Sequence, residues 1–169
     1  MEIKNCVFAD LEIIFNLFDH AIAYQKTKNT VVWPVFNKQD IIDAISEKRQ
    51  FKVVIENKIA CVWTYTFGDQ FIWGNKDKND AIYIHKIATN PDFKGQNMVQ
   101  KIVNFSTKLA IEKQKLFLRM DTVGQNKGLI SHYTKCGFTF LGMFAIKEYI
   151  NLPAHYHEAE VSLFELKVQ

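Results

Sequence analysis

Residues 126–138 combine side chains that could do chemistry with a spacing that would place them together. The stretch reads N-K-G-L-I-S-H-Y-T-K-C-G-F and follows a short apolar segment, Leu116 to Asp121. Asn126 and Tyr133 are seven residues apart, so on a helix they lie on nearly the same face. Gly137 stands where the end of a helix favours a left-handed residue. The pattern predicts a strand, a polar turn, a helix that presents the Tyr133 phenol, and a new strand.

Two other side chains could move a proton. His85 titrates in a range that suits a general base, and Asp121 offers a carboxylate at the end of the apolar segment. Both also have ordinary explanations, because His85 could be hydrogen-bonded within the core and Asp121 could bind turn amides. For Tyr133 and Asn126, the ordinary explanations are an aromatic ring packed under the sheet and a helix N-cap.

The remaining histidines of interest do not form a metal-binding pattern. His155 and His157 lie two residues apart beside Pro153, and His132 lies on the predicted helix. A metal site needs further ligands at close spacing, and we find no third ligand at such a spacing in the sequence. We therefore expect no metal.

Apolar periodicity predicts the elements that position these residues. Strands are expected at 2–6, 51–55, 59–67, 81–89, 116–121, 138–146 and 159–166, and helices after Asp10, after Asn37, at 96–114 and at 126–136. Asn57-Lys58 predicts a hairpin turn, and residues 69–80 are expected to form a polar connection. The order indicates an α/β fold with a sheet of mixed direction. A chain of 169 residues suffices for one domain spanning residues 1–169.

Composition argues against several classes of protein. The net charge of +3 comes without clustered basic residues, so a nucleic-acid-binding surface is not expected. No apolar run approaches the ~18 residues of a membrane span, and no N-terminal stretch has the order of a signal peptide. Cys6, Cys61 and Cys136 are widely spaced, which indicates a reducing compartment. We expect a cytoplasmic protein without nucleic-acid or membrane partners.

The element order and the stretch from Ala81 to Phe138 together resemble the GNAT N-acetyltransferases. The resemblance covers nearly the whole chain in element order, whereas the motifs that carry it occupy the central third. It implies an α/β fold: a single GNAT-like domain with a mixed, mostly antiparallel sheet and helices on both faces.

The family's pyrophosphate loop has an altered counterpart in this sequence. In the family, a loop of pattern Q/R-x-x-G-x-G/A opens a helix, and its backbone N–H groups hold the pyrophosphate of coenzyme A. The corresponding residues are Lys94, Gly95, Gln96, Asn97, Met98 and Val99. Lys94 keeps a positive charge without arginine's planar fork, and Asn97 replaces a glycine while tolerating positive φ. The β-branched Val99 argues against ordinary coenzyme A binding, and the alternative is a plain loop that starts a surface helix.

The second motif is better preserved. In the family, the tyrosine at the position of Tyr133 protonates the departing thiolate of coenzyme A. The asparagine at the position of Asn126 contacts the pantetheine arm or orders the helix start. The resemblance also implies that the backbone of Ile87, Ala88 and Thr89 pairs with the pantetheine amides like an added strand. One backbone N–H there would polarise the thioester carbonyl.

The implied reaction needs a base. A lysine-like amine has a pKa of about 10.4, so it must lose a proton before it attacks the thioester. Asp121 lies five residues before Asn126, where many members place a glutamate. His85 lies in the preceding strand, and these strands splay apart in the family, so both side chains could border one cleft. The loop that holds Trp33 and Phe36 corresponds to the family's substrate-covering region.

The resemblance thus implies an N-acetyltransferase that moves an acetyl group from acetyl-CoA to a primary amine of a small molecule or peptide. Transfer would be by direct attack in a ternary complex, without a metal, and homodimers through the last strands are common in the family. The alternative is a non-catalytic ligand-binding or regulatory module of the same fold with a degraded pyrophosphate loop. The acceptor amine stays open at this point.

Overall fold

The structure, a computed structural model, describes residues 1–28, 30–146, 152, 154–157 and 159–168. The chain folds as two compact units, Met1–Tyr65 with His85–Met98 and Thr66–Ile84 with Val99–Gln169. Strand β4 (Ala81–Thr89) and helix α4 (Met98–Glu112) each continue from one unit into the other.

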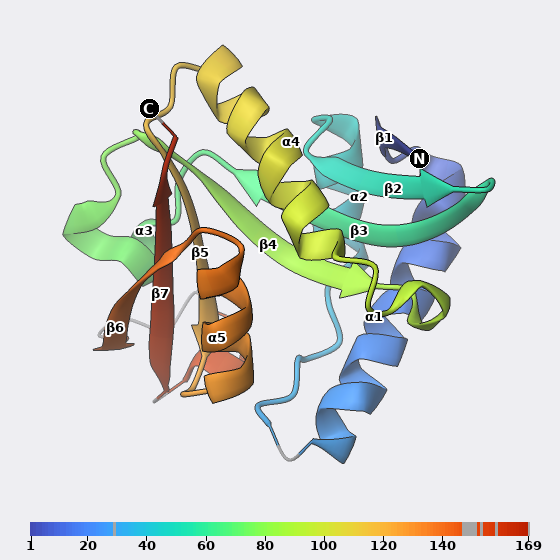
Figure 1. Ribbon diagram of the computed structural model, residues 1–169. Helices are drawn as coiled ribbons and strands as arrows, with labels where there is room; N and C mark the ends of the chain where they lie inside the picture. The colour runs from blue at the N-terminus through green and yellow to red at the C-terminus, as the bar shows by residue number, and fades with distance from the viewer. Residues whose placement is uncertain (29, 147–151, 153, 158, 169) are drawn as a thin grey trace. The chain divides into compact units, whose positions relative to one another are not determined.

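Within the described residues, the strands follow the order β1-β2-β3-β4-β5-β7-β6 (Figure 1). Besides β4, the strands are β1 (Glu2–Asn5), β2 (Gln50–Ile55), β3 (Lys58–Thr66), β5 (Phe117–Val123), β6 (Thr139–Ala145) and β7 (Glu160–Lys167). Besides α4, the helices are α1 (Leu11–Thr27), α2 (Lys38–Ser46), α3 (Gln70–Trp73) and α5 (Lys127–Lys135). Strands β4 and β5 are parallel, whereas β1–β2, β2–β3, β5–β7 and β6–β7 are antiparallel. The predicted mixed, mostly antiparallel sheet is confirmed. Of the helices in the described ranges, none has both the length and the apolar character needed to cross a membrane.

The first unit contains the predicted hairpin between β2 and β3. Glu56 and Asn57 form its turn with φ values of 48° and 62°. A two-residue turn with positive φ at both positions suits the twist of an antiparallel hairpin. The turn lies one residue earlier than the predicted Asn57-Lys58 pair, because Lys58 already belongs to β3.

Helices α1 and α2 supply much of the apolar core of the first unit. Ile14, Leu17 and Phe18 lie on one face of α1 with helical spacing, and each is at most 3% exposed. They cluster with Ile41 and Ile45 of α2 and with strand residues of the same unit. The helical spacing read from the sequence is therefore the spacing of the buried face.

Asp10 precedes α1 as predicted, but its carboxylate does not cap the helix. It accepts the Val7 N–H at 2.7 Å and pairs with Lys52 of β2 at 2.6 Å. The backbone of Asp10 is already helical, with φ −83° and ψ −8°, whereas a capping residue is normally extended. Asn37 is extended and does cap α2, since its Oδ1 accepts the Gln39 N–H at 2.8 Å.

The second unit contains a parallel pair of strands, as expected for a sheet of mixed direction. Ala81 of β4 lies opposite Phe117 of β5, and β5 pairs along its length with β7. Trp73, Ala81, Tyr83, Val161 and Leu163 form a buried apolar cluster in this unit.

Residues 69–80 are more structured than the predicted polar connection. Helix α3 occupies Gln70–Trp73, and the Asp69 carbonyl accepts the N–H groups of Ile72 at 3.2 Å and Trp73 at 2.9 Å. Trp73 is 3% exposed and packs edge-on against Tyr83, with ring centroids 5.7 Å apart. The apolar run Phe71-Ile72-Trp73 indicated this packing, because Ile72 and Trp73 pack into the apolar cluster of this unit.

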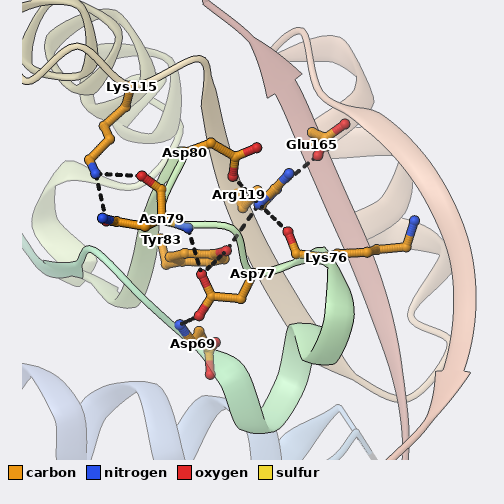
Figure 2. A network of polar contacts seen from close by, with 9 residues as sticks. All are labelled: Asp69, Lys76, Asp77, Asn79, Asp80, Tyr83, Lys115, Arg119 and Glu165. Carbon is orange, nitrogen blue, oxygen red and sulfur yellow. Dashed lines mark hydrogen bonds and ion pairs between the residues drawn. The ribbon is translucent and has the colours of Figure 1, made fainter.

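Arg119 of β5 holds this segment in place through a buried polar network (Figure 2). The side chain is almost fully buried, and its guanidinium donates to the Lys76 carbonyl and Asp80 carboxylate, both at 2.9 Å. It also donates to the Tyr83 hydroxyl at 3.0 Å and the Glu165 carboxylate at 2.8 Å. A buried charge needs such pairing, so the network fixes the segment after α3 relative to β4, β5 and β7.

Candidate functional site

The predicted pyrophosphate loop, in the first unit, is anchored to strand β3. The Asn90 N–H donates to the Ala60 carbonyl at 2.9 Å, and the Asn90 side-chain amide donates to the Ile59 carbonyl at 3.0 Å. Its Oδ1 accepts the Asp92 N–H at 3.1 Å, which closes a turn over Pro91–Phe93. The loop therefore starts from a fixed point at the end of β4.

Two left-handed residues shape the rest of this loop. Gly95 has φ 81° and Asn97 has φ 55°, and α4 begins directly afterwards at Met98. The helix was predicted to begin at Gln96, and this is wrong because a left-handed residue cannot continue a right-handed helix. Asn97 does adopt the positive φ for which asparagine is the best substitute for glycine. Lys94 places its Nζ 4.3 Å from the centroid of the Tyr24 ring.

Some predicted cofactor-binding residues can contribute only their main chain. Ala88 is 1% exposed and Met98 4%, so their side chains belong to the interior. Ile87, Thr89 and Val99 are partly buried. Backbone groups at the end of β4 and in the loop, together with the exposed side chains of Lys94 and Gln96, are therefore the groups that could contact a cofactor here.

Lys86 adopts an unusual backbone conformation within β4. Its φ is 53°, although it lies inside a strand and is not a glycine. Non-glycine residues in this region are uncommon, and they cluster where the surrounding structure imposes the conformation. The Lys86 Nζ lies 5.3 Å from the centroid of the Phe36 ring. Burial lowers the pKa of Lys86, the charge of Asp40 raises it, and the charge of Arg49 lowers it.

His85 is partly buried immediately before Lys86. Its pKa is lowered to about 3, chiefly by burial and also by the positive charges of Lys86 and Arg49. The imidazole is therefore neutral near neutral pH and holds an added proton weakly. This property makes His85 a poor store for a proton taken from an amine.

Asp121 of β5 and Asp69 before α3 form a carboxylate pair in the second unit. Their carboxylate oxygens lie within 4.8 Å of each other. The pKa of Asp69 is raised to about 8, chiefly by burial and also by the negative charges of Asp121 and Asp77, while a hydrogen bond from the Ile72 N–H opposes this rise. Burial raises the pKa of Asp121 to about 6. Because like charges this close disfavour double ionisation, the pair tends to share a proton near neutral pH.

Asp121 and Asp69 have different hydrogen-bonding partners. The Tyr156 hydroxyl donates to Asp121 Oδ2 at 2.8 Å, which stabilises the Asp121 carboxylate and opposes the effect of burial. The Asp69 N–H donates to Asp77 Oδ2 at 2.7 Å, so Asp69 extends the polar network of Arg119 (Figure 2). Asp69 Oδ2 and Thr122 Oγ1 are buried and have no hydrogen-bond partner among the described residues.

Helix α5 begins and ends close to the prediction. The Leu129 N–H donates to Asn126 Oδ1 at 3.1 Å, so Asn126 is the helix N-cap. Gly137 has φ 99°, the left-handed conformation predicted at the helix end. Tyr133 is 8% exposed, and its ring packs edge-on against Phe164 with centroids 5.2 Å apart. The ordinary explanations hold for the asparagine cap and the tyrosine ring, and they leave a chemical role open to the Tyr133 hydroxyl.

The large aromatic residues divide between the units. In the first unit, the ring centroids of Trp33 and Phe36 lie 5.4 Å apart, and both rings pack against the core of α1 and α2. Trp63 is a fully buried core residue of the same unit. In the second unit, Trp73 and Tyr83 are core residues.

Three residues of interest were not singled out in the sequence: Lys86, Asp69 and Tyr156. Asp69 directly precedes the Gln70-Phe71-Ile72-Trp73 segment, so an aspartate before an apolar run was a usable helix-start signal. Nothing in the local sequence marks a positive φ at Lys86. Tyr156 is distant in sequence from Asp121, and only the folded chain brings the two together.

Comparison with known proteins gives a consistent family. The acetyltransferase (GNAT) family model matches residues 18–138. The uncharacterized N-acetyltransferase YesJ of Bacillus subtilis is 23% identical over 144 residues, which cover 80% of this chain and 80% of that protein. A GNAT-family acetyltransferase structure from Listeria monocytogenes has a TM-score of 0.78 at 19% identity, covering 98% of this chain and 94% of that one. The structure of yncA, a putative acetyltransferase from Salmonella typhimurium, with its cofactor acetyl-CoA has a TM-score of 0.70 at 12% identity. The match covers 99% of this chain and 94% of that one.

Proposed function

Since the chain belongs to the acetyltransferase (GNAT) family, we propose that it transfers the acetyl group of acetyl-CoA directly to a primary amine of a small molecule or peptide, in a ternary complex. The observation that carries the proposal is the loop before α4, where Gly95 and Asn97 both have positive φ. Consecutive backbone N–H groups in such a turn, followed by the positive end of a helix dipole, suit the pyrophosphate of coenzyme A. Residues 1–169 are taken as one acyltransferase domain.

The proposed cofactor contacts follow the chain in order. The pyrophosphate would be held by Lys94, Gly95, Gln96, Asn97, Met98 and Val99, and the pantetheine arm by Ile87, Ala88, Thr89 and Asn126. Main-chain groups dominate this set, so the change from glycine to Asn97 is tolerated. Val99 is the departure that most restricts the approach of the cofactor, because its β-branched side chain occupies the first turn of α4.

The proposed chemistry forms a C–N bond and breaks a C–S bond. The neutral amine attacks the thioester carbonyl carbon, and the thiolate leaves with a proton from the Tyr133 hydroxyl. We assign the removal of the amine proton to Asp121, directly or through water. Its pKa of about 6 leaves it largely ionised above neutral pH, whereas His85, with a pKa of about 3, retains a proton poorly.

Thermal unfolding with coenzyme A and acetyl-CoA tests cofactor binding. A ligand present at 100 times its Kd stabilises the native state by about 2.7 kcal/mol, which raises Tm by roughly 5–10 °C for a chain of this size. Absence of any shift at millimolar concentration would overturn the enzyme proposal and leave the non-catalytic module.

Initial rates with two varied substrates test the order of transfer. Intersecting double-reciprocal lines are expected for a ternary complex. Parallel lines would indicate an acetylated enzyme intermediate and would contradict direct transfer.

A further inference from the structure

Lys86 is the least explained charged residue of the first unit. A lysine at φ 53° inside a strand is held in a conformation that glycine or asparagine adopts more easily. It immediately precedes Ile87 to Thr89, the backbone assigned above to the pantetheine arm. Strained residues of this kind concentrate at ligand-binding positions.

The Lys86 ammonium has no anionic partner in the described part of the chain. Its side chain is partly buried, and its neighbour is the Phe36 ring, with 5.3 Å from Nζ to the ring centroid. Asp40 of α2 is close enough to raise the pKa of Lys86 but does not form an ion pair with it. Taking a charge out of water is costly unless a partner compensates it, and the Phe36 ring compensates the Lys86 ammonium only weakly, so this cation is available to bind an anion.

Arg49 adds a second positive charge near Lys86. Arg49 contributes positive charge that lowers the pKa of both Lys86 and His85. Its own guanidinium is engaged by Glu47 at 2.6 Å and by the Tyr65 carbonyl at 3.1 Å. His85 remains neutral and does not compensate for Lys86. An oxyanion beside Lys86 would therefore meet the Lys86 ammonium and the Phe36 ring, while Arg49 is already paired with Glu47.

We propose that Lys86 is an acceptor-recognition residue whose ammonium binds an oxyanion, carboxylate or phosphate, carried by the amine substrate beside its amino group. The proposal rests on the acetyltransferase function proposed above and names the class of its acceptor. An ammonium group is a compact charge that does not demand a planar partner, so it can serve either oxyanion.

Matched pairs of amines test this proposal. Alanine is compared with alaninamide, and phosphoethanolamine with ethanolamine, by following thiol release from acetyl-CoA. For wild type, the anionic member of at least one pair should have a kcat/KM roughly 10-fold or more above its neutral match. In Lys86→Met, which keeps the length of the side chain without its charge, that preference should disappear while the neutral match stays within about twofold. Lys86→Arg should retain most of the preference, and Lys38→Met, at an exposed position of α2, is the matched control.

Several outcomes would overturn the assignment. If wild type has the same kcat/KM for both amines of each pair, Lys86 does not recognise an oxyanion, whatever the variants show. An equal fall for both members in Lys86→Met points to a structural role, and a smaller coenzyme A-induced Tm shift in that variant assigns Lys86 to the cofactor instead. Absence of thiol release with every amine counts against the proposed function itself, so the two failures are distinguishable.

Discussion

Tyr133 has a ring and a hydroxyl whose roles can be separated by one substitution. The ring is 8% exposed and packs edge-on against Phe164. Tyr133→Phe keeps that packing, so we expect the thermal midpoint and coenzyme A affinity to stay nearly unchanged. If the hydroxyl protonates the thiolate, kcat should fall roughly 10²-fold. Steady-state rates together with thermal shifts measure both effects, and an unchanged kcat would remove Tyr133 from proton transfer.

Asp69 and Asp121 should make stability depend on pH in a defined direction. Their folded pKa values of about 8 and about 6 exceed the ordinary value of about 3.9. Between about pH 4 and pH 8 the folded protein therefore binds more protons than the unfolded chain. The contribution of these groups is complete below that window and declines as the pH rises through the folded pKa values.

Asp69→Asn should remove most of this decline. The variant should match wild type near pH 5, where Asp69 is protonated, and exceed it at pH 8 by on the order of 1 kcal/mol in the free energy of unfolding. Urea unfolding at both pH values measures the difference. Asp19→Asn, at an exposed position of α1, is the control. If the variant is less stable than wild type at pH 8, then burial and repulsion do not make the ionised Asp69 carboxylate destabilising.

At the scale of single residues, the sequence predicted correctly those conformations that depend only on neighbouring residues. Asn126 and Gly137 lie at the two ends of one short helix, so their cap conformations follow from nearby residues. Lys86 and the pair of Asp69 with Asp121 depend on segments distant in sequence. Their burial and neighbouring charges exist only once the strands have paired, and a single sequence does not encode those distances directly.

The sequence predicted well the helices and strands with long apolar patterns. It did not predict an element boundary fixed by one residue, or a helix of only four residues. Strand β4 has the predicted bounds, since its apolar run is long and ends at Asn90-Pro91. Helix α4 begins two residues later than predicted because the left-handed Asn97 stops it from extending backwards. Helix α3 was missed because its four residues are too few to show a helical period.

The turn before α4 gives the prediction that belongs to the element scale. Asn97 is exposed and has φ 55°, so its substitution removes little packing and tests the backbone. Asn97→Gly should keep both stability and cofactor binding. Asn97→Val places a β-branched residue at positive φ and should destabilise the fold by about 1–2 kcal/mol. It should also weaken coenzyme A binding, because the N–H groups of the loop are redirected.

Thermal unfolding with and without coenzyme A measures both effects of these variants. Equal binding by the valine and glycine variants would show that the pyrophosphate does not use this turn.

At the scale of the whole molecule, two compact units share continuous elements. The boundary between the units falls between Ile84 and His85 within β4, and between Met98 and Val99 in α4. A helix forms cooperatively, because each ordered residue helps to order the next, and a strand that loses its partner strands in one unit leaves its continuation in the other unit less restrained. Continuity of β4 and α4 therefore favours a single cooperative unfolding transition over two independent ones.

Tryptophan fluorescence can report on each unit separately. Trp63 is buried in the first unit and Trp73 in the second. Each test variant keeps one of these two tryptophans and has phenylalanine in place of the other tryptophans. In each variant, the urea midpoint measured by tryptophan fluorescence should equal the midpoint measured by circular dichroism. Coincidence of the probes is the criterion for a two-state transition. A Trp73 signal that changes before the secondary structure is lost would show that the second unit opens independently, so that continuity of β4 and α4 does not couple the two units.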